Sequence, residues 1–293
     1  MHKNILIVGG TDGIGRAVAQ QMAALHYSVT IVGRSSQKGT AVLTWLNQRY
    51  PEGQHHFIAA DLSEMSNVVQ VVKDIQKLAI PYDTVLHTAD VLKVAREETP
   101  EGLEVSIATN FYARVLMNDL LVWKNEDSPT KHIIHVAAAG FPPGKNFMKK
   151  FPVASTASSF TGHGVGQIAN DFYGYYAANY LCSRSVQVNI LNPGMVDTDI
   201  RRNGSFPKWA RGLLSLMDVL LTRMTTAPEE YAKIVVDIIT GANPVAQHSV
   251  LINAKGKTKS PSRHLLERET QQYVVDTARQ EIDRLLKVKR VAG

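Results

Sequence analysis

The segment 8–19, VGGTDGIGRAVA, has residue types and a spacing that suit phosphate binding. Gly9, Gly13 and Gly15 follow the strand-like run ILIV and open a helical pattern. Small residues let the backbone approach a pyrophosphate, and the N-terminus of the following helix offers free N–H groups and partial positive charge. This strand–turn–helix context predicts a dinucleotide site at the start of the chain.

A second chemical signal follows the next strand-like run, SVTIVG. Arg34 stands where dinucleotide folds that prefer NAD usually place a carboxylate for the ribose 2′-hydroxyl. Its planar donor fork suits a 2′-phosphate, and Ser35 and Lys38 are placed to assist. We predict NADP(H) rather than NAD(H), the alternative being a plain surface arginine.

Asp61, in AADLS, is placed to accept a hydrogen bond from the adenine amino group. In this first part of the chain the candidate cofactor residues are Gly9, Thr11, Gly13, Ile14, Gly15, Arg34, Ser35, Lys38, Asp61, Leu62 and Ala89.

These residues need a scaffold that brings distant loops together. Short β-branched runs alternate with longer amphipathic segments such as 13–26 and 68–79, which indicates βαβ units on a parallel sheet, an α/β fold with helices on both faces. The ligand crevice of such sheets lies outside the carboxyl ends of the strands. The strand candidates are 4–9, 28–33, 55–60, 83–88, 131–137, 186–191 and 248–253.

Composition narrows the function classes. The 293 residues are 44% hydrophobic and carry a net charge of +6, but no basic stripe interleaves with aromatic residues, so no nucleic-acid partner is expected. The single cysteine, Cys182, excludes an intrachain disulfide and fits a reducing compartment. With no signal-peptide layout and no apolar run long enough for a bilayer, we expect one cytoplasmic domain, 1–293, without stable membrane insertion.

Three regions depart from the alternation of strands and helices. Residues 139–161 form a long loop beyond the carboxyl end of a strand, and 262–288 form a C-terminal helical tail. Residues 206–226 are an apolar insertion. We interpret this insertion as a lid over a bulky substrate; core packing and a membrane-surface helix are the alternatives.

Several motifs, in order, resemble those of the short-chain dehydrogenase/reductase superfamily, nearest to its retinol-dehydrogenase-like group. They are GGTDGIG, AADLS, TNFYARVLMNDLL and LNPGMVDTDI. The resemblance implies a seven-stranded, doubly wound Rossmann sheet, and it matches Asn110 to the structural asparagine of the catalytic set. It also assigns the loop that holds the nicotinamide carboxamide to Pro193, Gly194, Val196 and Thr198.

The same resemblance implies that three of four catalytic groups are replaced. The family uses a serine to orient the substrate carbonyl, a tyrosine to transfer a proton and a lysine to assist the tyrosine. Ala138, His163 and Gln167 stand at these positions, and the family's NNAG reads HTAD at 87–90. General acid–base help is worth roughly 10²–10⁴-fold, so the loss argues against ordinary ketone or alcohol chemistry.

His163 has two interpretations. It is either a proton-transfer group, with Gln167 and Asn110 as hydrogen-bonding supports, or a polar filler in a disused site. A helix N-terminus disfavours the imidazolium, so we expect the neutral form to be available as a base. Asp90 and Asp171 are the nearby candidates for modulating its charge.

Three functions remain open at this point. The first is an NADP(H)-dependent oxidoreductase with a rebuilt site, acting in secondary metabolism on an activated C=N or C=C of a bulky, largely apolar small molecule. The second is a redox-neutral cyclase or isomerase in which His163 moves protons and NADP(H) is structural. The third is a non-catalytic NADP(H)-binding regulator or scaffold. No metal site is expected, and homo-oligomerisation is left open.

Overall fold

The computed structural model describes residues 3–93, 95–138, 151–152, 158–181, 186–196 and 225–292. Most of the expected loop 139–161, nearly all of the expected lid 206–226, and Thr198 lie outside these residues. Within the described part, no helix is long and apolar enough to cross a membrane.

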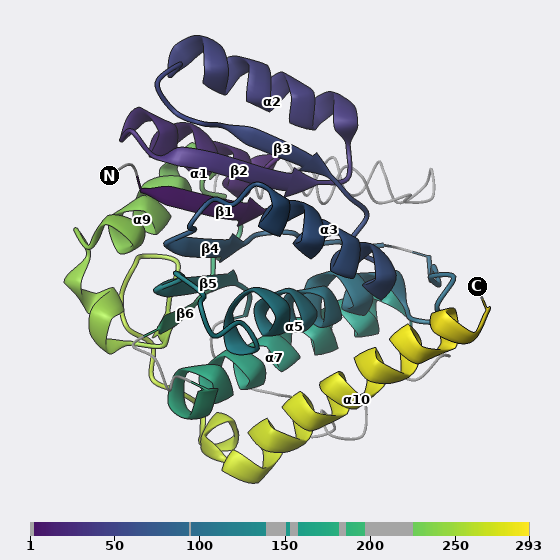
Figure 1. Ribbon diagram of the computed structural model, residues 1–293. Coiled ribbons are helices and arrows are strands. Elements are labelled where there is room, and N and C mark those ends of the chain that lie inside the picture. The colour runs from purple at the N-terminus through teal and green to yellow at the C-terminus, as the bar shows by residue number, and fades with distance from the viewer. Residues whose placement is uncertain are drawn as a thin grey trace, which may run out of the picture.

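One seven-stranded sheet organises the chain (Figure 1). Its order is β3-β2-β1-β4-β5-β6-β7, and every neighbouring pair is parallel. The predicted α/β class and doubly wound arrangement are confirmed, and each strand falls inside its predicted segment. The strands are β1 (Asn4–Val8), β2 (Ser28–Gly33), β3 (His56–Ala59), β4 (Thr84–His87), β5 (His132–Val136), β6 (Gln187–Leu191) and β7 (Leu251–Ile252).

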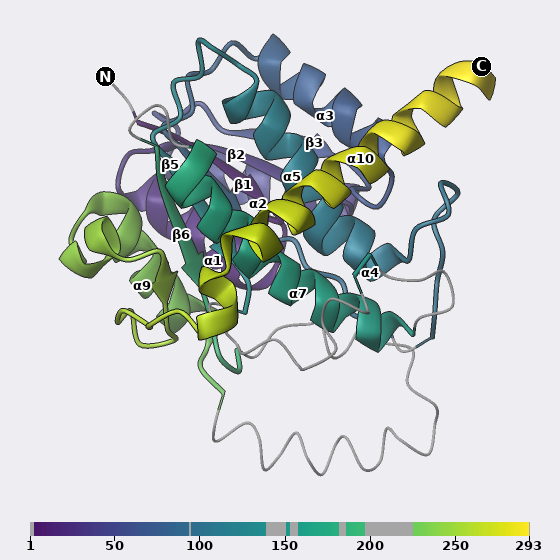
Figure 2. The same cartoon turned by 90° about the horizontal axis from the view of Figure 1, so that it is seen from below.

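Helices cover both faces of this sheet (Figures 1 and 2). One face carries α1 (Gly13–Ala24), α2 (Ser36–Arg49) and α9 (Pro228–Thr240). The other face carries α3 (Met65–Lys77), α4 (Val105–Ile107), α5 (Ala113–Asn118), α7 (Ser159–Tyr176) and α10 (Arg268–Ala292), with the π-helical turns η1 (Ala108–Tyr112), η2 (Asp119–Trp123) and η3 (Ala177–Leu181). Two short 3₁₀ turns, η4 (Pro244–His248) and η5 (Arg263–Leu266), precede β7 and α10.

Alternate side chains of each strand supply two separate cores. In β1, Ile5 and Ile7 pack towards α1 and α9, whereas Leu6 and Val8 pack towards α3 and α5. All four are buried, as expected for a parallel strand with both faces covered. Burial of each such side chain stabilises the fold by about 1.5–3 kcal/mol. The inner strands are therefore well packed, and they fix the positions at which the loops of the site begin.

The C-terminal helix α10 lies across α7 and α5 (Figure 2). Val274, Val275 and Ala278 bury its apolar stripe in the same core as α7. Arg279 adds a two-pronged ion pair, with Nε 2.8 Å and Nη2 2.6 Å from the carboxylate oxygens of the buried Asp119. The helical tail expected at 262–288 corresponds to η5 and α10.

Candidate functional site

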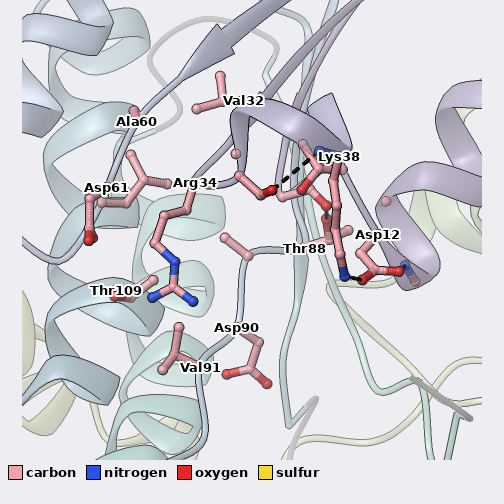
Figure 3. A pocket seen from close by; sticks show the side chains of 18 of the residues that line it. Asp12, Val32, Arg34, Lys38, Ala60, Asp61, Thr88, Asp90, Val91 and Thr109 are labelled. Atoms are coloured by element: carbon pink, nitrogen blue, oxygen red, sulfur yellow. Dashed lines mark hydrogen bonds and ion pairs between the residues drawn. The ribbon is translucent and has the colours of Figure 1, made fainter. Parts of the chain in front are cut away.

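A cavity of about 460 Å³ lies at the carboxyl ends of β1, β2, β3 and β4 (Figure 3). The strand order reverses direction between β1 and β4, which is where ligands bind in open α/β sheets. All candidate cofactor residues of the first part of the chain, from Gly9 to Ala89, line this cavity. The structure also places Asp12, Thr88, Asp90, Val91 and Thr109 in its wall.

The glycine loop is shaped by close backbone contacts. Gly9 has a φ of +100°, and a Cβ on it would lie 2.3 Å from the backbone nitrogen of Ala89. A Cβ on Gly15 would lie 2.2 Å from the carbonyl oxygen of Gly9. These contacts explain the glycines sterically and leave a cradle open at the N-terminus of α1 for a pyrophosphate.

Two cations line the cavity, and they are not equivalent. Lys38 forms an ion pair with Asp12, which also caps α1 by accepting a hydrogen bond from the backbone N–H of Gly13 at 2.8 Å. Burial raises the pKa of Asp12, but the hydrogen bonds from Lys38 and Gly13 outweigh it, and the net pKa is lowered. Arg34 makes no hydrogen bond or ion pair with any described residue, and Figure 3 shows its side chain extending into the cavity.

Of the other predicted cofactor residues, some line the cavity and some do not. Ser35 caps α2, accepting from the backbone N–H of Lys38 at 3.2 Å, and Asp61 accepts from the backbone N–H of Ser63 at 2.9 Å. Pro193, Gly194 and Val196 follow β6 but do not line the cavity.

Asn192 connects the end of β6 to that of β5. Its side-chain amide donates to the carbonyl of Ala138 at 2.8 Å, and its side-chain oxygen accepts from the backbone N–H of Gly194 at 2.8 Å. The position that the resemblance assigns to a serine, Ala138, therefore follows β5 with no hydroxyl to offer.

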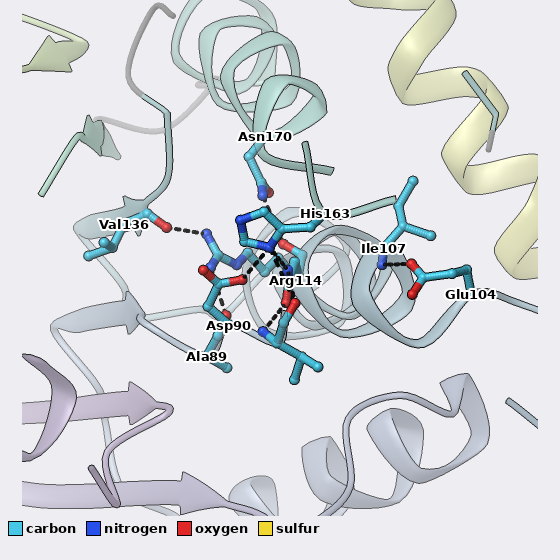
Figure 4. A network of polar contacts seen from close by, with 10 residues as sticks. Ala89, Asp90, Glu104, Ile107, Arg114, Val136, His163 and Asn170 are labelled. Carbon is cyan, nitrogen blue, oxygen red and sulfur yellow. Dashed lines mark hydrogen bonds and ion pairs between the residues drawn. The ribbon is translucent and has the colours of Figure 1, made fainter. Parts of the chain in front are cut away.

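His163 lies in the first turns of α7 and meets the end of β4 (Figure 4). Its Nδ1 lies 3.3 Å from Oδ1 of Asp90, 3.2 Å from the carbonyl oxygen of Val91 and 3.1 Å from Nδ2 of Asn110. Its Nε2 makes no hydrogen bond within the described part of the chain. His163 and Asn110 were predicted to share one site, and the structure brings them together.

Asn110 is fully buried in η1, where it fixes the peptide of Val91. Its side-chain oxygen accepts from the backbone N–H of Val91 at 2.7 Å, and its Nδ2 donates to the carbonyl of Val91 at 2.9 Å. Asn170 of α7 in turn donates to the main-chain oxygen of Asn110 at 2.8 Å. Gln167 joins none of these contacts, and its Oε1 is buried without a hydrogen-bond partner among the described residues.

The charge environment of His163 differs from our expectation. Burial lowers the pKa of His163, but the carboxylate of Asp90, the carbonyl of Val91 and the charge of Glu104 outweigh it, so the net pKa is raised. The expectation that the helix N-terminus leaves the neutral form more available was therefore wrong, because nearby acceptors dominate. Of the two carboxylates considered, Asp90 makes the contact, whereas Asp171 is buried further along α7.

A buried cation that the sequence analysis missed stands behind Asp90. Arg114 of α5 is 1% exposed and donates to the carbonyls of Ala89 and Val136, both at 2.8 Å, so it ties the carboxyl ends of β4 and β5 together. Burial lowers the pKa of Arg114 to about 10, although the charge of Asp90 opposes the shift, and it stays protonated at neutral pH. An arginine inside the otherwise apolar run FYARVLM was the available signal.

No cluster of three or more His, Cys, Asp or Glu side chains in the described residues is arranged to hold a metal ion. The Asp90–His163 contact is the titratable pair that the structure places at the cavity wall.

Comparison with known proteins identifies the family. A family model described as short chain dehydrogenase matches residues 3–149, half of the chain. The chain belongs to the short chain dehydrogenase family. Its seven-stranded parallel sheet and glycine-loop cavity agree with that membership.

Curated relatives are distant. Human polyprenol dehydrogenase is 24% identical over 204 residues, which cover 68% of this chain and 62% of the relative. Retinol dehydrogenase 14 of Mus musculus is 25% identical over 229 residues, or 74% and 68% of the two chains. An oxidoreductase of Emericella nidulans is 34% identical over 143 residues, or 46% and 42%. The chain thus spans about 62% of the length of the human polyprenol dehydrogenase.

Solved structures share the fold. An NADPH dependent reductase involved in bacilysin biosynthesis superimposes with a TM-score of 0.63 at 17% identity, covering 89% of this chain and 100% of the other. A 3-oxoacyl-(acyl-carrier-protein) reductase from Agrobacterium tumefaciens, with NADP bound, gives a TM-score of 0.60 at 21% identity, covering 87% and 89%. At these identities the likeness establishes the fold alone.

Proposed function

We propose that this chain is an NADP(H)-dependent oxidoreductase with a rebuilt proton-transfer site. The observation that carries the proposal is the cavity itself. The guanidinium of Arg34 lines it without a polar partner among the described residues, and its wall also contains Asp90 in contact with His163. The substrate we propose is a bulky, largely apolar small molecule with an activated C=N or C=C, of the kind found in secondary metabolism.

The residues present fit an NADP(H) molecule. The cradle at Gly9 and Gly15 has no room for a Cβ, and a pyrophosphate beside it would face the N-terminus of α1. Arg34 would hold the 2′-phosphate, because its donor fork makes two parallel hydrogen bonds to such a group. Lys38 would contribute less than expected from sequence, since Asp12 already neutralises it.

When bound, NADPH supplies a hydride to the electrophilic carbon of the substrate. An iminium carbon becomes an amine on receiving the hydride and needs no proton. A conjugated C=C becomes an enolate, and His163 would deliver the balancing proton from Nε2. Neither acceptor depends on the serine hydroxyl or lysine that Ala138 and Gln167 replace, so the altered site supports these acceptors over simple carbonyls.

The proposal is tested by binding and turnover together. Titration should show tighter binding of NADPH than of NADH, and Arg34→Ala should erase the difference. Arg49→Ala, at the exposed end of α2, is the matched control and should still bind NADPH more tightly than NADH. Equal affinities for the two cofactors in the unaltered protein would contradict the cofactor assignment.

Turnover is measured as NADPH oxidation with paired acceptors, each unsaturated ketone or iminium ion beside its simple ketone counterpart. We expect oxidation with the activated member only. His163→Ala should lower turnover of a C=C acceptor by roughly 10²-fold while NADPH affinity stays nearly unchanged. Robust oxidation with simple ketones would contradict the proposed acceptor class.

A redox-neutral cyclase or isomerase is the second candidate, and the contact between His163 and Asp90 favours it because proton transfer needs only that pair. Product formation without NADPH consumption would select it. NADPH binding without any product would instead select a non-catalytic regulator or scaffold.

Three further parts of the proposal concern the setting of the site. We propose that 206–226 covers the substrate as an apolar lid, and that residues 1–293 act as one domain. We also propose a cytoplasmic location, which the single Cys182 favours. Limited proteolysis with and without substrate, and fluorescence localisation, test the first and last of these.

A further inference from the structure

We propose that Asp90 is the positioning residue of this site: its carboxylate orients His163 through Nδ1 and keeps a proton available at Nε2. The inference rests on the proposed function of His163 in proton transfer. Asp90 suits the task because it belongs to the cavity wall and also lies 3.3 Å from the imidazole, and the two side chains are 21% and 22% exposed.

The two residues are separate departures from the family pattern that meet in space. By the resemblance, position 90 would be the glycine that ends NNAG, and position 163 the tyrosine. They stand 73 residues apart in sequence, on the loop after β4 and on α7. Relative to the family pattern, this chain has an added carboxylate that faces an added imidazole. A carboxylate in such a place stabilises an imidazolium, because opposite charges attract across a partly buried gap.

Two of the three contacts at Nδ1 favour a hydrogen on this nitrogen. The carboxylate of Asp90 and the carbonyl of Val91 are acceptors that face it. The third neighbour, Nδ2 of Asn110, carries two hydrogens, one of which the carbonyl of Val91 accepts at 2.9 Å, while the nitrogen itself lies 3.1 Å from Nδ1. In the imidazolium both ring nitrogens carry a hydrogen and the two acceptors hold that of Nδ1, so Nε2 is the nitrogen that gives up the transferred proton.

Arg114 places a buried positive charge near the carboxylate of Asp90. Its guanidinium is buried and donates to two carbonyls rather than to a carboxylate, so its positive charge is not neutralised by a hydrogen-bonded acid. Asp90 is the carboxylate whose charge acts on it.

Glu104, on the helix-capping turn of α4, is the other acidic group that acts on His163. It is buried and accepts from the backbone N–H of Ile107 at 3.1 Å. Its side chain lies close to α7, as the space at Gly162 shows: a Cβ added there would lie only 2.1 Å from Oε2 of Glu104. The acidic groups that act on His163 are thus Asp90 after β4 and Glu104 at the start of α4, and the buried Arg114 on α5 lies near Asp90.

The test follows the imidazole directly, in the full chain without substrate. Histidine-selective ¹⁵N labelling gives a titration curve for each imidazole, and His163→Gln identifies the curve of His163 by its loss. In the unaltered protein the midpoint should lie above 6.5, the ordinary value for histidine. Asp90→Asn, which keeps the shape, should lower it by about one pH unit, whereas Asp237→Asn, an exposed acid on α9, should leave it in place.

Circular dichroism establishes that each variant is folded, and Asp90→Ser provides a second variant if Asp90→Asn does not fold. Asp90→Glu should restore part of the lost shift. A folded Asp90→Asn protein with an unchanged His163 curve would overturn the inference. Unchanged turnover of a C=C acceptor in His163→Gln would instead refute the proton-transfer role in the proposed function, and the titration would still decide whether Asp90 governs the imidazole.

Discussion

Two buried histidines at the centre of the sheet make the stability of this protein sensitive to acid. His87 of β4 and His135 of β5 are register partners, both fully buried, with ring centroids 5.0 Å apart in a stacked arrangement. Asn118 lies between them, its side-chain oxygen 2.8 Å from Nε2 of His87 and its nitrogen 3.3 Å from Nε2 of His135. One amide thus serves two neutral imidazoles.

The size of the stability loss in acid follows from the lowered pKa values of these two rings. Burial and the charge of Arg114 lower the pKa of His87 to about 3, although the hydrogen bond with Asn118 opposes the shift. Burial, His87 and Arg114 lower the pKa of His135 well below its ordinary value. Unfolded histidines titrate near 6.5, so below that pH the unfolded chain binds more protons and the folded state loses stability.

Each such histidine costs about 1.4 kcal/mol per pH unit between its two pKa values. Lowering the pH from 6.5 to 5 therefore costs about 2 kcal/mol through His87 alone, and His135 adds a loss of the same sign. Stability that is complete above pH 6.5 is lost progressively as the pH falls towards 3.

The assay is urea unfolding at pH 7 and pH 5, which gives a free energy of unfolding at each pH. We expect His87→Gln to lose about 2 kcal/mol less than the unaltered protein between these two values, whatever its stability at pH 7. His248→Gln, at an exposed position, should match the unaltered protein. Identical pH dependence in His87→Gln and the unaltered protein would refute the reasoning.

Two more predictions follow from packing and ion pairing. Arg279→Met, which leaves the buried Asp119 without its two-pronged partner, should lower the free energy of unfolding by about 1–3 kcal/mol, measured by urea unfolding, and a loss below 0.5 kcal/mol would contradict it. Gly15→Ala should abolish NADPH binding in calorimetry, because its Cβ would force α1 away from Gly9, whereas Gly164→Ala, with nothing within 4 Å of its Cβ, should bind normally and gain up to about 1 kcal/mol in stability.

Local patterns predicted the α/β class, the strand segments and the glycine loop, and the family resemblance added the doubly wound, seven-stranded sheet. A strand whose two faces are both buried has a continuous apolar sequence, so such strands could be located along the chain from the sequence. The loop at Gly9 and Gly15 was recognisable because backbone sterics there exclude every side chain, whatever the rest of the fold does.

Contacts between distant segments could not be read from the sequence. The pair formed by Asp12 and Lys38 joins residues 26 apart, and the contact between Asp90 and His163 joins residues 73 apart. A prediction from helix position alone gave the wrong direction for the charge of His163, because a helix end contributes a partial charge whereas Asp90 contributes a full one.

Helix α7 holds its place through residues other than His163 and Gln167, the two that the resemblance aligns with catalytic positions. Val165, Ala169, Phe172 and Tyr173 form the buried face of α7, and Ser158 caps its start by accepting from the backbone N–H of Thr161 at 3.2 Å. Neither the packing face nor the cap includes His163 or Gln167. Gly9 and Gly15 of the cofactor loop are constrained by main-chain geometry instead, because a Cβ on either would lie against backbone atoms. The fold of α7 and the glycine loop thus depend on residues other than the two to which the proposed function assigns the proton chemistry.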